Sequence, residues 1–158
     1  SKHTVYEGGF RVPFIVSWPD KLKHSVNDEP VISVDVMPTI CAALGIELPK
    51  DIIYDGKNIL SAINGELEGP LHEQLFFDGN DGSWAVREGD WKLLYNKKKS
   101  LELYNLKEDY VEQNNLLSEF PDKVADLKAK YTTWRSEMGT PMGGDPKKKK
   151  KNKKSSHK

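Results

Sequence analysis

The region from residue 120 to residue 138 constrains the fold most, because its apolar residues follow one helical stripe. Successive apolar side chains are three or four positions apart: Phe120, Val124, Leu127, Tyr131, Trp134 and Met138. Residues with this spacing share one face of an α-helix, so we expect a helix at Pro121–Glu137. Pro121 suits the first helical turn, where no N–H is required. A helix with one apolar face must bury that face against another element.

The preceding residues predict a sheet that could receive this helix. Residues 75–78, 84–95 and 101–106 are short runs in which apolar side chains alternate with polar ones, as in strands with one buried face. The Gly89-Asp90 pair divides the second run into a hairpin, and glycine in the first position favours a type II′ turn. We therefore expect a small antiparallel sheet with the long helix on one face.

The first half of the chain predicts a different mixture of elements. Residues 11–18 (RVPFIVSW) form a compact apolar run that ends at Pro19-Asp20, which is typical of a buried strand. A helix is expected to begin near Val36 and to end before Gly45. A shorter helix is expected at residues 59–63.

Charge is unevenly distributed, although the formal net charge is zero. Residues 147–158 contain eight lysines and no acidic residue, which leaves 16 basic and 24 acidic residues in the rest. A segment of this composition cannot bury apolar surface, so we expect residues 141–158 to be a disordered tail. The tail lacks interleaved aromatic residues, which argues against specific nucleic-acid binding and leaves weak contact with polyanions. No apolar run is long enough for a transmembrane helix.

Five short motifs occur in series along the chain. They are SKHTVYEGGFRVP at residues 1–13, Asp35-x-x-Pro38-Thr39, VRxGDWKL at residues 86–93, LYNL at residues 103–106, and Glu112-x-x-Asn115-Leu116. Together they resemble the C-terminal part of an arylsulfatase-like, formylglycine-dependent sulfatase of the alkaline phosphatase superfamily. One such motif is weak, whereas five in the same order are specific.

The resemblance implies an α/β, alkaline-phosphatase-like fold, of which this chain is a fragment. Residues 1–70 would be the end of the catalytic domain and carry the edge of its large sheet. Residues 71–140 would be a C-terminal subdomain containing the small antiparallel sheet and the long helix.

Lys2 is the catalytic candidate. A lysine near a chain start is usually a solvated surface residue, but the resemblance places Lys2 beside the sulfate and the leaving oxygen. A fixed ammonium there would stabilise negative charge that develops during ester cleavage. The neighbouring His3 could contact substrate or move a proton, although a histidine on the rim without a chemical role is the more common case.

The other site candidates divide into structural and substrate-binding groups. Glu7, Gly8 and Gly9 are expected to hold a turn, with glycines that permit positive φ or close backbone approach, and Arg11 is expected to pair with Asp35. Possible substrate contacts, each more often a surface or core residue, are His72, Asp78, Asn80 and Trp84.

The nucleophile and metal ligands are expected outside this chain. Cys41 is followed by Ala42-Ala43-Leu44-Gly45, which does not match the Cys/Ser-x-Pro/Ala-x-Arg motif that becomes formylglycine. By the resemblance, calcium (or magnesium) and formylglycine belong to the parent enzyme, and no metal ligand is assigned here. The fragment alone would be inactive.

The implied reaction is hydrolysis of a sulfate ester on a sulfated small molecule or carbohydrate. A phosphate or phosphonate monoester hydrolase of the same superfamily and a non-catalytic polyanion-binding module remain as alternatives. A typical bacterial sulfatase would be periplasmic or secreted.

Overall fold

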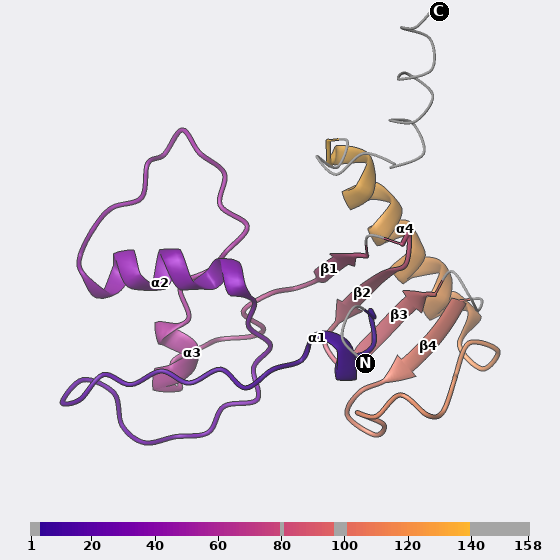
Figure 1. Ribbon diagram of the computed structural model, residues 1–158, viewed down its shortest axis with the longest axis horizontal. Helices are drawn as coiled ribbons and strands as arrows, with labels where there is room; N and C mark the ends of the chain where they lie inside the picture. Colours follow the sequence, from indigo (N-terminus) through magenta and orange to yellow (C-terminus); the bar gives the residue numbers. More distant parts are fainter. Residues whose placement is uncertain (1–3, 80, 97–100, 140–158) are drawn as a thin grey trace, which may run out of the picture.

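The computed structural model describes residues 4–79, 81–96 and 101–139. Figure 1 shows two parts that lie side by side and are joined by the chain that follows residue 10 and by the chain that precedes residue 75. One part, called here the sheet-helix unit, comprises a four-stranded sheet with the helices α1 (Glu7–Phe10) and α4 (Pro121–Glu137). The other, called the open segment, is residues 11–70. The Lys-rich tail at residues 141–158 lies outside the described residues.

The sheet is an antiparallel meander, as the sequence predicts. Its strands are β1 (Leu75–Asp78), β2 (Trp84–Glu88), β3 (Trp91–Tyr95) and β4 (Leu101–Asn105), in the spatial order β1-β2-β3-β4. Glu88 pairs with Trp91 at the end of the β2–β3 hairpin. Gly89 has φ of 54° and Asp90 is outside the left-handed region, which agrees with the expected type II′ turn.

The helix α4 (Pro121–Glu137) covers one face of this sheet, so the predicted bounds and packing are confirmed. Its Leu127 is fully buried and joins an apolar cluster with Val86, Leu93 and Leu103 from three strands. Phe76 of β1 stacks on Trp134 of α4 with ring centroids 4.9 Å apart. The apolar stripe of α4 therefore meets the surface that it requires.

The opposite face of the sheet is covered by the start of the chain. Val5 is buried in a second cluster with Ala85, Leu94, Tyr104 and Leu106. The short helix α1 (Glu7–Phe10) follows, and Phe10 stacks on Phe77 of β1 at 4.4 Å. The first ten residues thus contribute to the same core as the C-terminal sheet, while the domain boundary at residue 70 stays a prediction.

The open segment contains the expected helices but little apolar core. A 3₁₀ turn, η1 (Ser33–Asp35), leads into α2 (Val36–Ala43), and α3 (Leu60–Asn64) follows. The predicted start of α2 at Val36 is confirmed. Gly45, just beyond its end, has φ of 67°, a left-handed conformation that glycine adopts without steric cost.

The predicted buried strand at residues 11–18 is wrong for this structure. These residues have no regular secondary structure, and Ile15 is 87% exposed. A strand is stabilised by ladder hydrogen bonds to a neighbour, and the sheet found among the described residues holds only β1 to β4. The sequence pattern identified an apolar segment correctly, but the part of the chain that the structure describes supplies no strand beside it.

No helix among the described residues is long and apolar enough to cross a membrane.

Candidate functional site

The best-defined polar cluster of the chain surrounds the side chain of Lys92. Lys92 is completely buried, and its Nζ lies 2.8 Å from Glu7 Oε1 and 2.8 Å from Glu112 Oε1. The ammonium also lies over the Phe10 ring, 4.4 Å from the centroid. We call Glu7, Lys92 and Glu112 the buried triad.

Each member of the triad comes from a different element. Lys92 is in β3 and shares a sheet face with Leu94, the face that α1 covers. Glu7 opens α1. Glu112 lies beyond β4 with φ of 59°, and its Oε2 accepts a hydrogen bond from the Glu7 backbone N–H at 2.6 Å. Asp109 Oδ2 accepts the next two backbone N–H groups after Glu112, which fixes this turn.

The charges of the triad do not balance. When all three groups are ionised, two buried carboxylates share one buried ammonium. Burial raises the pKa of Glu112, while the nearby ammonium of Lys92 opposes that rise. A buried charge is costly unless it is paired, so Lys92 is the contact that makes both carboxylates tolerable at this depth.

A second polar contact holds the residue before Glu7. The Tyr6 hydroxyl donates to Glu102 Oε2 in β4, and Tyr104 donates to the same oxygen at 2.9 Å. Burial and the Glu102 contact raise the pKa of Tyr6 to about 12. Both phenols are therefore neutral donors at neutral pH.

Gly9 is required by close packing rather than by positive φ. A Cβ at Gly9 would lie 2.3 Å from the Thr4 carbonyl oxygen, whereas one at Gly8 would meet nothing within 4 Å. Neither glycine has positive φ, because both lie in α1. The expected close backbone approach is thus found at Gly9, whereas the expected positive φ is found at neither glycine. The Glu7 carbonyl accepts the Arg11 N–H at 2.9 Å within the turn, whereas the Glu7 side chain leaves the turn and pairs with Lys92.

Asp35 is the polar centre of the open segment, but its ionic partner is not Arg11. The His72 Nε2 lies 3.0 Å from both Asp35 oxygens, and both side chains are almost fully buried. The same carboxylate accepts hydrogen bonds from the backbone N–H groups of Ile32 and Lys57. Arg11 is exposed, so the expected Arg11–Asp35 pair is wrong: His72 occupies that carboxylate.

The proposed substrate contacts lie in separate places. His72 faces Asp35, whereas Asp78 accepts a hydrogen bond from Tyr131 at 2.5 Å and an ion pair from Arg135 at 3.1 Å. Trp84 stacks on Tyr131 with centroids 4.0 Å apart. Asp78 and Trp84 therefore contact α4, and their roles toward substrate stay predictions.

Lys2, His3 and Asn80 lie outside the described residues. Among the described residues, no three His, Cys, Asp or Glu side chains are grouped in a way that could hold a metal ion.

A family model described as "N-sulphoglucosamine sulphohydrolase, C-terminal" matches residues 1–137. The chain belongs to this sulfatase family. The match confirms the resemblance that the five motifs indicated, and it includes every member of the buried triad.

Curated relatives agree with this assignment. An N-acetylgalactosamine-6-O-sulfatase of Bacteroides thetaiotaomicron is 28% identical over 141 residues, covering 80% of this chain and 27% of the relative. A sulfatase of Formosa agariphila is 32% identical over 165 residues, covering 90% of this chain and 30% of the relative. The chain thus spans less than a third of the length of these sulfatases.

Solved structures show the same fold. A structure from work on glycosaminoglycan metabolism by Bacteroides thetaiotaomicron gives a TM-score of 0.71 at 24% identity, covering 85% of this chain and 31% of that one. A sulfatase structure from Bacteroides fragilis gives a TM-score of 0.58 at 20% identity, covering 79% of this chain and 29% of that one. The predicted alkaline-phosphatase-like class is confirmed.

Sequence reasoning missed Lys92 and Glu112 as site residues. Both belong to motifs that were noted, but simple alternation places Lys92 on the polar side of its strand. A signal was present: Leu94 and Tyr104 share a face with Lys92 and Glu102 in the expected hairpin register. Large apolar side chains on that face indicate that it is covered, and a lysine on a covered face requires an acidic partner.

Proposed function

We propose that the enzyme containing this chain hydrolyses sulfate esters, and that Lys2 contacts the sulfate group. The family match over residues 1–137 carries this proposal. Removal of the alcohol from a sulfate ester places negative charge on the leaving oxygen and redistributes it on the sulfate. An ammonium held at that position stabilises the charge more in the transition state than in the bound ester.

The nucleophile and metal of the reaction are proposed to come from residues outside this chain. In the family, formylglycine supplies the nucleophile, and calcium or magnesium supplies positive charge at the sulfate. The described residues do not fit either group: no metal-ligand cluster is present among them, and Cys41 lies within α2 followed by two alanines. The role derived for this chain is therefore to bind and orient through its own side chains.

A sulfated carbohydrate is the proposed substrate class. One relative is named for N-acetylgalactosamine-6-O-sulfate chemistry. A solved structure with TM-score 0.52 contains D-glucosamine-2-N,6-O-disulfate as the substrate of that protein. Both names concern sulfated amino sugars, which makes such sugars the first substrates to test.

The exposed apolar residues of the open segment support a larger enzyme around this chain. Side chains that are roughly half exposed or more include Val12, Phe14, Ile15, Met37, Ile40, Leu44, Ile46, Ile52 and Ile53. A group of this size is typical of a surface that another part of a protein covers. We propose that the rest of the sulfatase catalytic domain covers it.

The proposal is tested with the full-length enzyme. Wild-type protein is assayed on matched sulfate, phosphate and phosphonate esters, and we expect sulfate hydrolysis to be fastest. Lys2→Ala should lower kcat about 10²–10³-fold, whereas Lys128→Ala, at an exposed position on α4, should leave kcat unchanged. Faster hydrolysis of phosphate or phosphonate would reassign the enzyme class, and unchanged kcat in Lys2→Ala would remove Lys2 from the reaction.

A further inference from the structure

Three consecutive side chains fasten the start of the chain to the sheet. Val5 is buried among apolar residues, Tyr6 donates a hydrogen bond to Glu102, and Glu7 pairs with Lys92. Lys2 precedes Val5 by only three residues in the sequence. The segment that supplies the proposed sulfate contact is therefore continuous with the most strongly held part of the chain's beginning.

Glu112 makes a different contact with each carboxylate oxygen. Oε1 lies 2.8 Å from Lys92 Nζ, while Oε2 accepts the Glu7 backbone N–H at 2.6 Å. The Glu112 side chain therefore holds two groups: the Lys92 ammonium, which pairs with the Glu7 side chain, and the Glu7 backbone N–H. Because Glu112 is 9% exposed, water cannot readily replace it as the acceptor of that N–H.

The triad carries more ionic groups than fold stability alone requires. A buried ion pair is often no more stabilising than apolar residues of similar volume, and the same sheet face also buries the apolar residues Val5, Ala85 and Leu94. What the charges add is a defined geometry, since a buried ammonium that is ion-paired with two carboxylates tolerates few alternative positions of α1. Displacement of a catalytic group by about 1 Å can cost about 100-fold in rate.

We propose that Lys92 and Glu112 are positioning residues that hold the Lys2 segment in its productive place. This inference rests on the proposed function, because Lys2 is the group that they would position. Neither residue is assigned a contact with substrate, so their effect on the reaction passes through Glu7 and α1.

The paired variants Glu112→Ala and Glu112→Gln in the full-length enzyme test the proposal. Glu112→Ala removes the acceptor of the Glu7 N–H, and we expect kcat per folded molecule to fall about 10–100-fold. Glu112→Gln retains one acceptor oxygen, which can serve the Glu7 N–H, but its amide NH2 then faces Lys92 Nζ and that contact is lost. We therefore expect it to lower kcat by a smaller factor than Glu112→Ala, because it keeps one of the two contacts.

A destabilised control separates positioning from a general loss of structure. Leu127→Ala removes a fully buried side chain on the opposite face of the sheet, so it should lower the melting temperature but leave kcat per folded molecule unchanged. Equal kcat losses in Glu112→Ala and Leu127→Ala would overturn the proposal. So would a loss in Glu112→Gln as large as that in Glu112→Ala.

Hydrogen exchange provides a readout that does not depend on the reaction. In Glu112→Ala, the backbone amides of residues 7–10 should exchange at least tenfold faster than in wild type, while those of β3 change little. Unchanged hydrogen exchange in α1 would show that Glu112 does not hold this helix in place, even if kcat fell. Faster exchange in α1 of an enzyme that hydrolyses no sulfate ester would confirm the attachment of α1 but refute the proposed function. The role of the triad in positioning Lys2 would then be refuted as well.

Discussion

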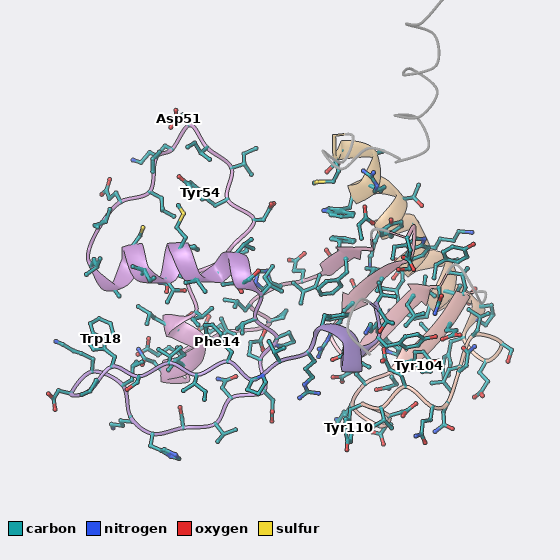
Figure 2. All side chains as sticks on the ribbon, in the orientation of Figure 1. Phe14, Trp18, Asp51, Tyr54, Tyr104 and Tyr110 are labelled. Atoms are coloured by element: carbon teal, nitrogen blue, oxygen red, sulfur yellow. The ribbon has the colours of Figure 1, made fainter. Side chains whose placement is uncertain are left out.

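The sheet-helix unit and the open segment use their apolar residues in opposite ways. In the unit, Val86, Leu93, Leu103 and Leu127 are completely inaccessible to solvent. In the open segment, Ile15 and Ile53 are 87% and 94% exposed. Figure 2 shows the same contrast: Phe14 and Trp18 lie on an extended stretch of chain that belongs to no sheet, whereas Tyr104 lies within the packed sheet.

The difference shows what each part needs from elsewhere. The unit closes both sheet faces with residues of this chain, α4 on one side and residues 5–10 on the other. In the open segment, Asp35 accepts hydrogen bonds from the backbone of Ile32 and Lys57, and Gly56 lies so close to Val34 that a Cβ would be 2.0 Å from the Val34 carbonyl oxygen. Polar contacts can define a local geometry, but apolar burial supplies most of the folding free energy.

The largest expected effect tests whether the unit depends on its buried charges. Lys92→Met leaves Glu7 and Glu112 buried without a cation, which should destabilise the unit by about 3–5 kcal/mol. Denaturant unfolding followed by fluorescence of Trp84 and Trp91 measures the change. As a control, the triple variant Glu7→Gln, Lys92→Met, Glu112→Gln should lose less, because no unpaired charge remains. A loss below about 1 kcal/mol in the single variant would contradict the role given to Lys92.

The second prediction tests whether the open segment is covered in the complete enzyme. Ile15→Ser should change the stability of this chain alone by less than about 0.5 kcal/mol, since Ile15 is exposed. In the full-length enzyme it should cost about 1.5–3 kcal/mol, because burial of an isoleucine is lost there. Leu94→Ser, at a fully buried position, should destabilise both proteins. Equal effects of Ile15→Ser in the two contexts would show that this position stays uncovered.

The third prediction concerns pH and the attachment of Tyr6. Its pKa is raised from 10.0 to about 12, so the folded state favours the neutral phenol. The resulting stability is fully present below pH 10 and is lost as the pH rises through about 12. Tyrosinate absorbance should show one late-titrating group fewer in Tyr6→Phe, which should also be about 1 kcal/mol less stable at neutral pH. A normal titration of Tyr6 would exclude the contact with Glu102.

The smallest effect is expected on the solvent side of the unit. Lys130 lies 2.6 Å from Glu88 and 2.9 Å from Asp126. Burial opposes ionisation of Glu88, but hydrogen bonds from Lys130 and Gln74 outweigh it and lower the Glu88 pKa. The resulting stability is present above the ordinary glutamate pKa and is lost as the pH falls through the lowered value.

Lys130→Ala should therefore cost about 0.5 kcal/mol, and the cost should shrink at high salt. Thermal unfolding at two salt concentrations measures it, with Lys128→Ala as the matched control on the exposed side of the same helix. A cost that salt does not change would show that the lysine stem, rather than its charge, stabilises the helix.

The features that sequence predicted correctly are those encoded by neighbouring residues. The spacing in α4 and the Gly89-Asp90 turn specify local geometry directly, and the structure has both. Residues 11–18 failed because a strand needs a partner that no local pattern supplies. Arg11 was assigned to Asp35 because they carry opposite charges, but His72 lies closer in the fold and takes that carboxylate.

The triad escaped prediction for the same reason. Lys92 meets Glu7 across 85 positions of sequence, and Glu112 meets the Glu7 amide across 105. The sequence contains the motifs that hold these residues, but it does not predict that the three side chains meet in one cluster. Alternation indicates which residues share a strand face, but only the tertiary fold shows that α1 covers this one.

The long separations within the triad also set an order of events during synthesis. Ribosomes release a chain from its N-terminal end, so Glu7 emerges well before either of its partners. The segment that follows Lys2 cannot form its ion pair until Lys92 has left the exit tunnel, and it cannot form its hydrogen bond to Glu112 until that residue has followed. A prematurely ended chain could carry every residue of the first motif and still leave that motif unattached.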